Sequence, residues 1–94
     1  EILLTTPPPS LFQKKYPNTF VASYTKAILD FAEKNNYAVW DMYINMGGLY
    51  SVNSNAKKGL MSRDKVHYSK QGYELQGELF FAALMETYTN FKSE

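Results

Sequence analysis

An apolar run at residues 2–6, ILLTT, is followed at once by Pro7, Pro8 and Pro9. Proline has no backbone N–H to donate to a sheet, so a strand formed by this run must end before the prolines. Successive side chains of a strand point to opposite faces of the sheet, and this run is apolar on both faces. Parallel sheets that are covered by helices on both faces have this pattern. The run therefore predicts a buried strand in an α/β protein.

The hydrophobic period changes after residue 18, where the spacing becomes that of an amphipathic helix. Asn18 or Thr19 is suited to cap its start, and Asn35-Asn36 marks its end. The apolar stripe consists of Phe20, Tyr24, Ala27, Ile28 and Phe31.

A second short strand is predicted at residues 37–40, YAVW. Asp41 follows it and is expected to cap the next turn, and Gly47-Gly48 should stop any helix there. Trp40 could stack on a sugar ring, but its place on a strand favours packing in the core.

Residues 49–66 show no clear period, and connections longer than about 12–15 residues are usually functional or disordered. Ser69 is then expected to cap a final helix that runs to about Tyr88. One face of that helix carries Tyr73, Gly77, Phe80, Leu84 and Tyr88, and Leu75, Leu79 and Ala83 widen the apolar surface.

The predicted order is β-α-β-α-loop-α, which indicates an α/β fold with parallel strands. Two strands rarely make a stable sheet, because three or more strands, or good helix cover, are normally needed. We therefore expect residues 1–94 to form a single partial domain, the C-terminal half of a larger one. Such a chain should either self-associate or pair with the missing half.

Composition excludes several classes of function. Ten basic and nine acidic residues give a net charge of +1, so nothing here favours binding of nucleic acid. The absence of cysteine excludes disulfides, thiolate metal sites and cysteine nucleophiles. A metal site is disfavoured by the single histidine, and no apolar run reaches the roughly 18 residues of a membrane span.

The single histidine, His67, stands three residues after Asp64 in the stretch DKVHYSKQG. A histidine can act as a general base near neutral pH when a carboxylate holds one ring nitrogen and the other faces a nucleophile. A tight turn brings side chains at i and i+3 together, so Asp64 is placed to be that carboxylate. D-x-x-H alone is a weak signal, since the pair could equally be an exposed turn.

The stretch DKVHYSKQGYELQG resembles the last sequence block of the SGNH/GDSL hydrolases, serine esterases with a flavodoxin-like three-layer α/β/α fold. EILLTTPPPS is similar to the strand after the third block of that family. YAVWDMYINMGG is similar to the next strand and turn, especially in members that act on acetylated carbohydrates, including peptidoglycan. Nearly all of the chain can be laid on the C-terminal half of that fold.

The resemblance implies that His67 is the general base and Asp64 its orienting carboxylate, in an esterase that needs no cofactor. The family's G-D-S nucleophile block and its G-x-N-D asparagine have no counterpart in the chain. We therefore expect the chain alone to be inactive and its full-length parent to be a serine esterase.

The substrate implied is a carboxylic ester, with O-acetyl groups on carbohydrate or peptidoglycan as the leading candidates. Tyr50, in the segment before the D-x-x-H block, could stack on a sugar ring. A periplasmic or secreted location follows from the resemblance only. The alternative function is a small, non-catalytic α/β interaction module.

Overall fold

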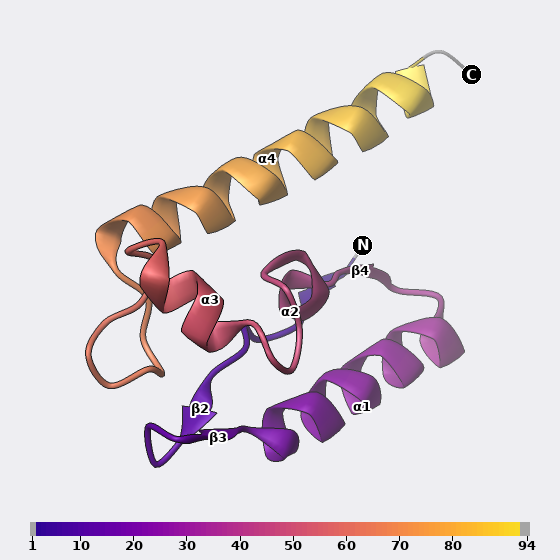
Figure 1. Cartoon of the computed structure of the whole chain (residues 1–94). Helices are drawn as coiled ribbons and strands as arrows, with labels where there is room; N and C mark the ends of the chain where they lie inside the picture. The colour runs from indigo at the N-terminus through magenta and orange to yellow at the C-terminus, as the bar shows by residue number, and fades with distance from the viewer. Residues whose placement is uncertain (1, 93–94) are drawn as a thin grey trace.

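The structure is a computed structural model that describes residues 2–92. Its strands and helices are shown in Figure 1. In chain order they are β1 (Leu3–Thr5), β2 (Leu11–Phe12), β3 (Tyr16–Pro17), α1 (Thr19–Asn35), β4 (Ala38–Trp40), α2 (Met42–Asn45), α3 (Val52–Lys57) and α4 (Lys70–Lys92).

The centre of the fold is a small parallel sheet made of β1 and β4, in which Leu4 lies opposite Val39. Helix α1 connects the two strands and lies on one side of them, and α4 lies on the other side (Figure 1). On the α4 side, the rings of Trp40 and Phe80 meet edge to face with centroids 5.1 Å apart. The chain is therefore a mixed α/β protein with parallel strands, as the sequence predicts.

The ends of the long helices follow the predicted capping residues. The Asn18 side chain accepts hydrogen bonds from the backbone N–H groups of Phe20 and Val21 at 3.1 and 3.3 Å. Asn36 ends α1 in the left-handed conformation with φ 55°. Ser69 Oγ accepts from Gly72 N at 3.1 Å at the start of α4, which continues to Lys92 rather than ending near Tyr88.

Two local features differ from the sequence prediction. Residues 49–66 are not wholly irregular, since they contain α3, whose Val52 is fully buried. The side chain of Asn55 donates to Met46 O at 2.9 Å and so fixes this short helix against the end of α2. The β2–β3 hairpin was not predicted, because its turn places Gln13 and Lys14 at φ 53° and 63° without the usual glycine or asparagine.

The predicted apolar stripes of the two long helices are largely uncovered. Phe20, Tyr24 and Phe31 on α1 are 75%, 63% and 54% exposed, and Leu84 and Tyr88 on α4 are 47% and 54% exposed. A two-stranded sheet is too narrow to cover the apolar faces of both helices. The radius of gyration, 14.4 Å, exceeds the roughly 12 Å expected for a compact domain of this length.

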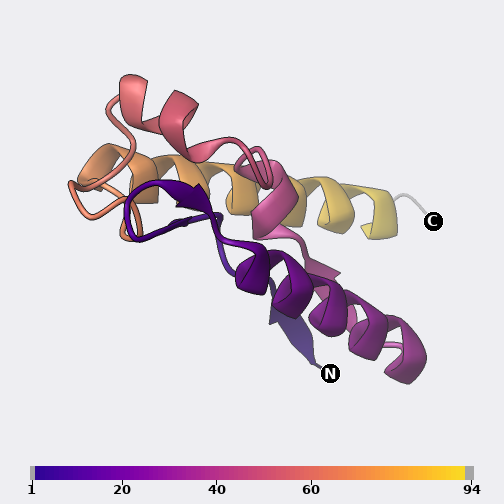
Figure 2. The same ribbon diagram turned by 60° about the horizontal axis from the view of Figure 1, so that its bottom comes forward.

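The buried residues gather around the sheet and at one end of the molecule. The hairpin, α3 and the start of α4 lie at that end (Figure 2). The buried residues include Leu11, Trp40, Tyr43, Met46, Val52 and Tyr68. Within residues 2–92, no helix has the length and apolar character needed to cross a membrane.

Candidate functional site

Asp64 and His67 lie on a tight loop between α3 and α4. Met61 and Tyr68 form an antiparallel bridge across its base, and Ser62 N donates to His67 O at 2.9 Å. The Ser62 hydroxyl donates to Tyr68 O at 3.3 Å, and Lys65 turns the loop with φ 58°. These backbone contacts fold residues 61–68 back on themselves and bring positions 64 and 67 together.

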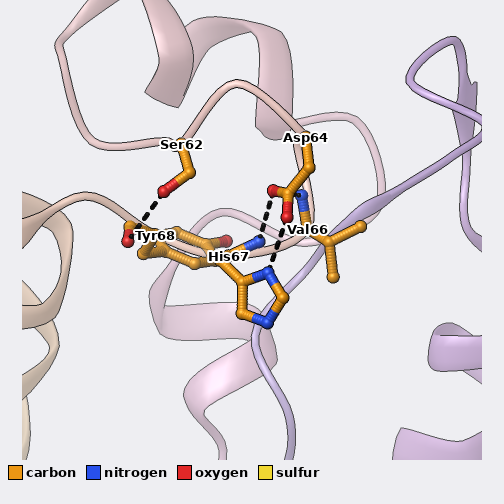
Figure 3. A network of polar contacts seen from close by, with 5 residues as sticks. All are labelled: Ser62, Asp64, Val66, His67 and Tyr68. Atoms are coloured by element: carbon orange, nitrogen blue, oxygen red, sulfur yellow. Dashed lines mark hydrogen bonds and ion pairs between the residues drawn. The ribbon is translucent and has the colours of Figure 1, made fainter.

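The Asp64 carboxylate binds His67 through both of its oxygens (Figure 3). Oδ1 accepts from the backbone N–H groups of Val66 and His67, each at 2.9 Å. Oδ2 lies 2.6 Å from Nδ1 of the His67 ring. The structure therefore brings together the two residues that the sequence singled out, in the i and i+3 geometry expected.

These hydrogen bonds determine the protonation state of the carboxyl group. The bond from the His67 ring, with those from the backbone N–H groups of Val66 and His67, holds the pKa of Asp64 well below its ordinary value of 3.8. An ionised carboxylate can only accept hydrogen bonds, so Nδ1 of His67 must carry the proton in this contact. In the neutral ring, Nε2 is then the nitrogen with a free lone pair.

The free nitrogen is open to approach. The His67 side chain is 70% exposed and that of Asp64 is 44% exposed. In Figure 3 the ring edge that carries Nε2 points away from the carboxylate and from the loop. An oriented imidazole with an accessible Nε2 can take a proton from a hydroxyl group that is brought to it.

The loop is anchored to the segment that follows β1. Tyr68, next to His67, is 3% exposed, and its hydroxyl donates to Pro9 O at 2.7 Å. Burial raises the pKa of Tyr68 to about 12. Leu11 N donates to Lys65 O at 2.9 Å, a second link between the two segments. The sequence prediction missed these positioning contacts, because they join residues that are far apart in the chain and local spacing does not predict such contacts.

The serine hydroxyls are engaged elsewhere or lie apart from the pair. Ser51, Ser62 and Ser69 donate to the backbone carbonyls of Gly48, Tyr68 and Gly59. Ser10 accepts from the Asn18 side chain at 3.3 Å. The described residues therefore place no serine hydroxyl in hydrogen-bond contact with the His67 ring.

The other residues considered from the sequence have separate places. Trp40 is buried against Phe80, which confirms the packing interpretation, and Asp41 caps α2 by accepting from Ile44 N at 3.2 Å. Tyr50 is 81% exposed in the turn before α3, with no hydrogen bond or ring contact to the Asp64–His67 pair within the described residues. Over residues 2–92, no three His, Cys, Asp or Glu residues are grouped closely enough to hold a metal ion.

Comparison with known proteins gives no relative for the chain: no family profile, curated protein or solved structure matches it.

Proposed function

We propose that this chain supplies the histidine and aspartate of a serine esterase of the SGNH/GDSL type. The observation that carries the proposal is the 2.6 Å contact between Asp64 Oδ2 and His67 Nδ1, which leaves Nε2 exposed. The D-x-x-H resemblance supports the same roles, with Asp64 as the orienting carboxylate and His67 as the general base.

The second carboxylate oxygen separates this proposal from a simple turn. Loops commonly contain an aspartate that accepts hydrogen bonds from the backbone N–H groups two and three residues ahead. In this loop Oδ1 of Asp64 alone accepts both of these bonds. Oδ2 has the further partner, the imidazole ring, and this contact fixes a tautomer. A non-catalytic module would need the turn but not an oriented ring with an open nitrogen.

The reaction follows from the roles of the two side chains. Nε2 of His67 takes the proton from a serine hydroxyl, supplied from outside these residues, as that oxygen attacks the ester carbonyl. Asp64 stabilises the imidazolium that forms, and His67 then gives the proton to the departing alcohol. In the second half His67 deprotonates water, which attacks the acyl-serine, and it then returns that proton to the serine oxygen as the acid is released. The N–H groups that stabilise the oxyanion also come from outside the chain.

The resemblance extends the proposal to O-acetyl esters of carbohydrates. Tyr50 offers an exposed aromatic ring of the kind that stacks on sugars. It is the residue we propose for substrate binding.

The proposed function is tested by comparing two proteins on p-nitrophenyl acetate. The 94-residue chain alone should hydrolyse the ester no faster than its His67→Ala variant and should not be labelled by a fluorophosphonate. A longer polypeptide that carries this chain together with a G-D-S segment should turn over the ester and should be labelled on its serine. Turnover by the chain alone above the His67→Ala control would contradict the proposal, as would an inert longer protein.

A further inference from the structure

Basic side chains gather in the segment that carries the Asp64–His67 loop. Residues 57–70 contain five of the ten basic residues of the chain and one of its nine acidic residues, Asp64. The five are Lys57, Lys58, Arg63, Lys65 and Lys70, of which only Lys65 is half-buried and the others are exposed. Ser69 Oγ donates to Gly59 O at 2.6 Å, so Lys58, just after α3, and Lys70, at the start of α4, adjoin one hydrogen-bonded pair.

The β2–β3 hairpin adds two more basic residues to this end of the molecule. Lys14 and Lys15 are exposed in its turn, and Leu11 N at its base donates to Lys65 O at 2.9 Å. The hairpin and the loop lie at the same end in both views (Figures 1 and 2). We call Lys14, Lys15 and the five basic residues of 57–70 the basic end. With Asp64 as the one acidic residue of these segments, their net charge is +6, whereas that of the whole chain is +1.

The charges of the basic end have no partner among the described residues. The ion pairs within residues 2–92 are Lys26–Asp30 and His67–Asp64, so the one carboxylate of this end is already bound to the imidazole. Glu74, one helical turn after Lys70, makes no ion pair with it. Grouped charges of one sign raise the local concentration of ligands of the opposite sign.

Two lysines of the basic end occupy backbone conformations that favour glycine. Lys14 has φ 63° and Lys65, inside the D-x-x-H block, has φ 58°. A side chain with a Cβ is strained in this region, and strain of this kind gathers at functional sites. The lysine at position 65 is therefore not explained by the turn that it forms.

We propose that the basic end binds an acidic polysaccharide, a glycan whose sugars carry carboxylates, and so brings its O-acetyl groups to His67. This inference rests on the proposed function for the choice of a glycan. The charge of the basic end adds that the glycan is anionic.

The distribution of the charges favours a polymer. They come from three places: the hairpin turn, the end of α3, and the loop with the start of α4. A small anion would meet one of these, whereas a chain with a charge on successive sugars can meet all three. Nucleic acid is also a polyanion, but it offers no O-acetyl ester to the His67 ring.

The experiment titrates the 94-residue chain with hexagalacturonate, and with maltohexaose as the neutral oligosaccharide of equal length. Calorimetry gives the affinity, and backbone amide shifts in nuclear magnetic resonance give the location. We expect hexagalacturonate to bind at least about tenfold more tightly than maltohexaose, and to weaken at least about fivefold between 50 and 200 mM salt. The shifts should fall in residues 14–15 and 57–70 and not in the middle of α1.

Two double variants with the same change of charge form the matched comparison. Lys57→Gln with Lys58→Gln should weaken hexagalacturonate binding at least about fivefold. Lys26→Gln with Lys34→Gln, on exposed positions of α1, should leave it within about twofold. Lys65→Asn separates binding from folding, because asparagine suits a positive φ. It should weaken binding and leave the urea midpoint no lower than that of the parent chain.

The outcomes separate this inference from the proposed function. Binding at the basic end by the chain, together with an inert longer protein that carries the G-D-S segment, supports the acidic glycan and contradicts the esterase. A longer protein that hydrolyses p-nitrophenyl acetate, while the chain does not bind hexagalacturonate, overturns this inference and leaves the esterase standing. Equal binding of maltohexaose, equal effects of the two double variants, or tighter binding of a hexathymidylate also overturns it.

Discussion

Replacing His67 with alanine, in a polypeptide that carries both this chain and the proposed nucleophilic serine, is expected to lower kcat by about 10⁴- to 10⁶-fold. Asp64→Asn should cost about 10⁴-fold, because an amide can donate to Nδ1 and select the wrong tautomer. Both effects follow from the single contact between Asp64 Oδ2 and His67 Nδ1. Steady-state hydrolysis of p-nitrophenyl acetate measures them.

Asp30→Asn is the matched control for the change at Asp64. Asp30 is an exposed carboxylate on α1 that pairs with Lys26 at 3.5 Å, the kind of surface pair that contributes little to stability. Its replacement should leave kcat within about twofold, since it lies apart from the D-x-x-H loop. Retention of more than a tenth of the activity by His67→Ala would remove His67 from the mechanism.

Gly72→Ala is expected to lower the free energy of unfolding of the chain by about 3 kcal/mol, the upper part of the range for overpacked sites. A Cβ at this position would overlap Leu60 O and would lie 2.9 Å from Tyr68 Cβ. The first of these atoms is backbone and the second is held by the Tyr68–Pro9 bond, so neither yields easily. Urea unfolding followed by circular dichroism measures the change.

Gly77→Ala provides the comparison within the same helix. It meets no atom within 4 Å, and alanine is the better helix former by about 1 kcal/mol, so this variant should be more stable than the parent chain. Equal effects of the two substitutions would show that Gly72 is not a point of close approach between α4 and the D-x-x-H loop.

The sequence predicts the local structure of this chain well where one residue controls one feature. The three prolines stop the first strand, Asn18 and Ser69 cap their helices, and Asp41 caps the turn after β4. The i and i+3 contact between Asp64 and His67 also follows from local spacing. Each of these features depends on neighbours within a few residues, which is the range that spacing and capping rules describe.

Features that depend on distant residues were beyond prediction. The anchoring of the loop depends on Tyr68 reaching Pro9 across 59 positions. The sequence indicates that two strands are too few to cover the apolar faces of the helices, and those faces are largely exposed. It does not indicate which helix residues are buried, namely Thr25, Ala32, Gly72 and Gln76. Hydrophobic spacing shows which face of a helix is apolar, but the width of the sheet decides how much of that face is covered.

The central claim is that Asp64 fixes the tautomer of the His67 ring, and nuclear magnetic resonance of the imidazole tests it most directly. The chain contains one histidine, so the spectrum shows the signals of one imidazole ring. Long-range ¹H–¹⁵N correlation is recorded at a pH at which the ring is neutral. We predict that Nδ1 carries the proton and Nε2 is free, and that Asp64→Ala abolishes this preference. A ring protonated on Nε2, or the same tautomer in both proteins, would contradict the claim that Asp64 holds His67 ready to accept a proton from serine.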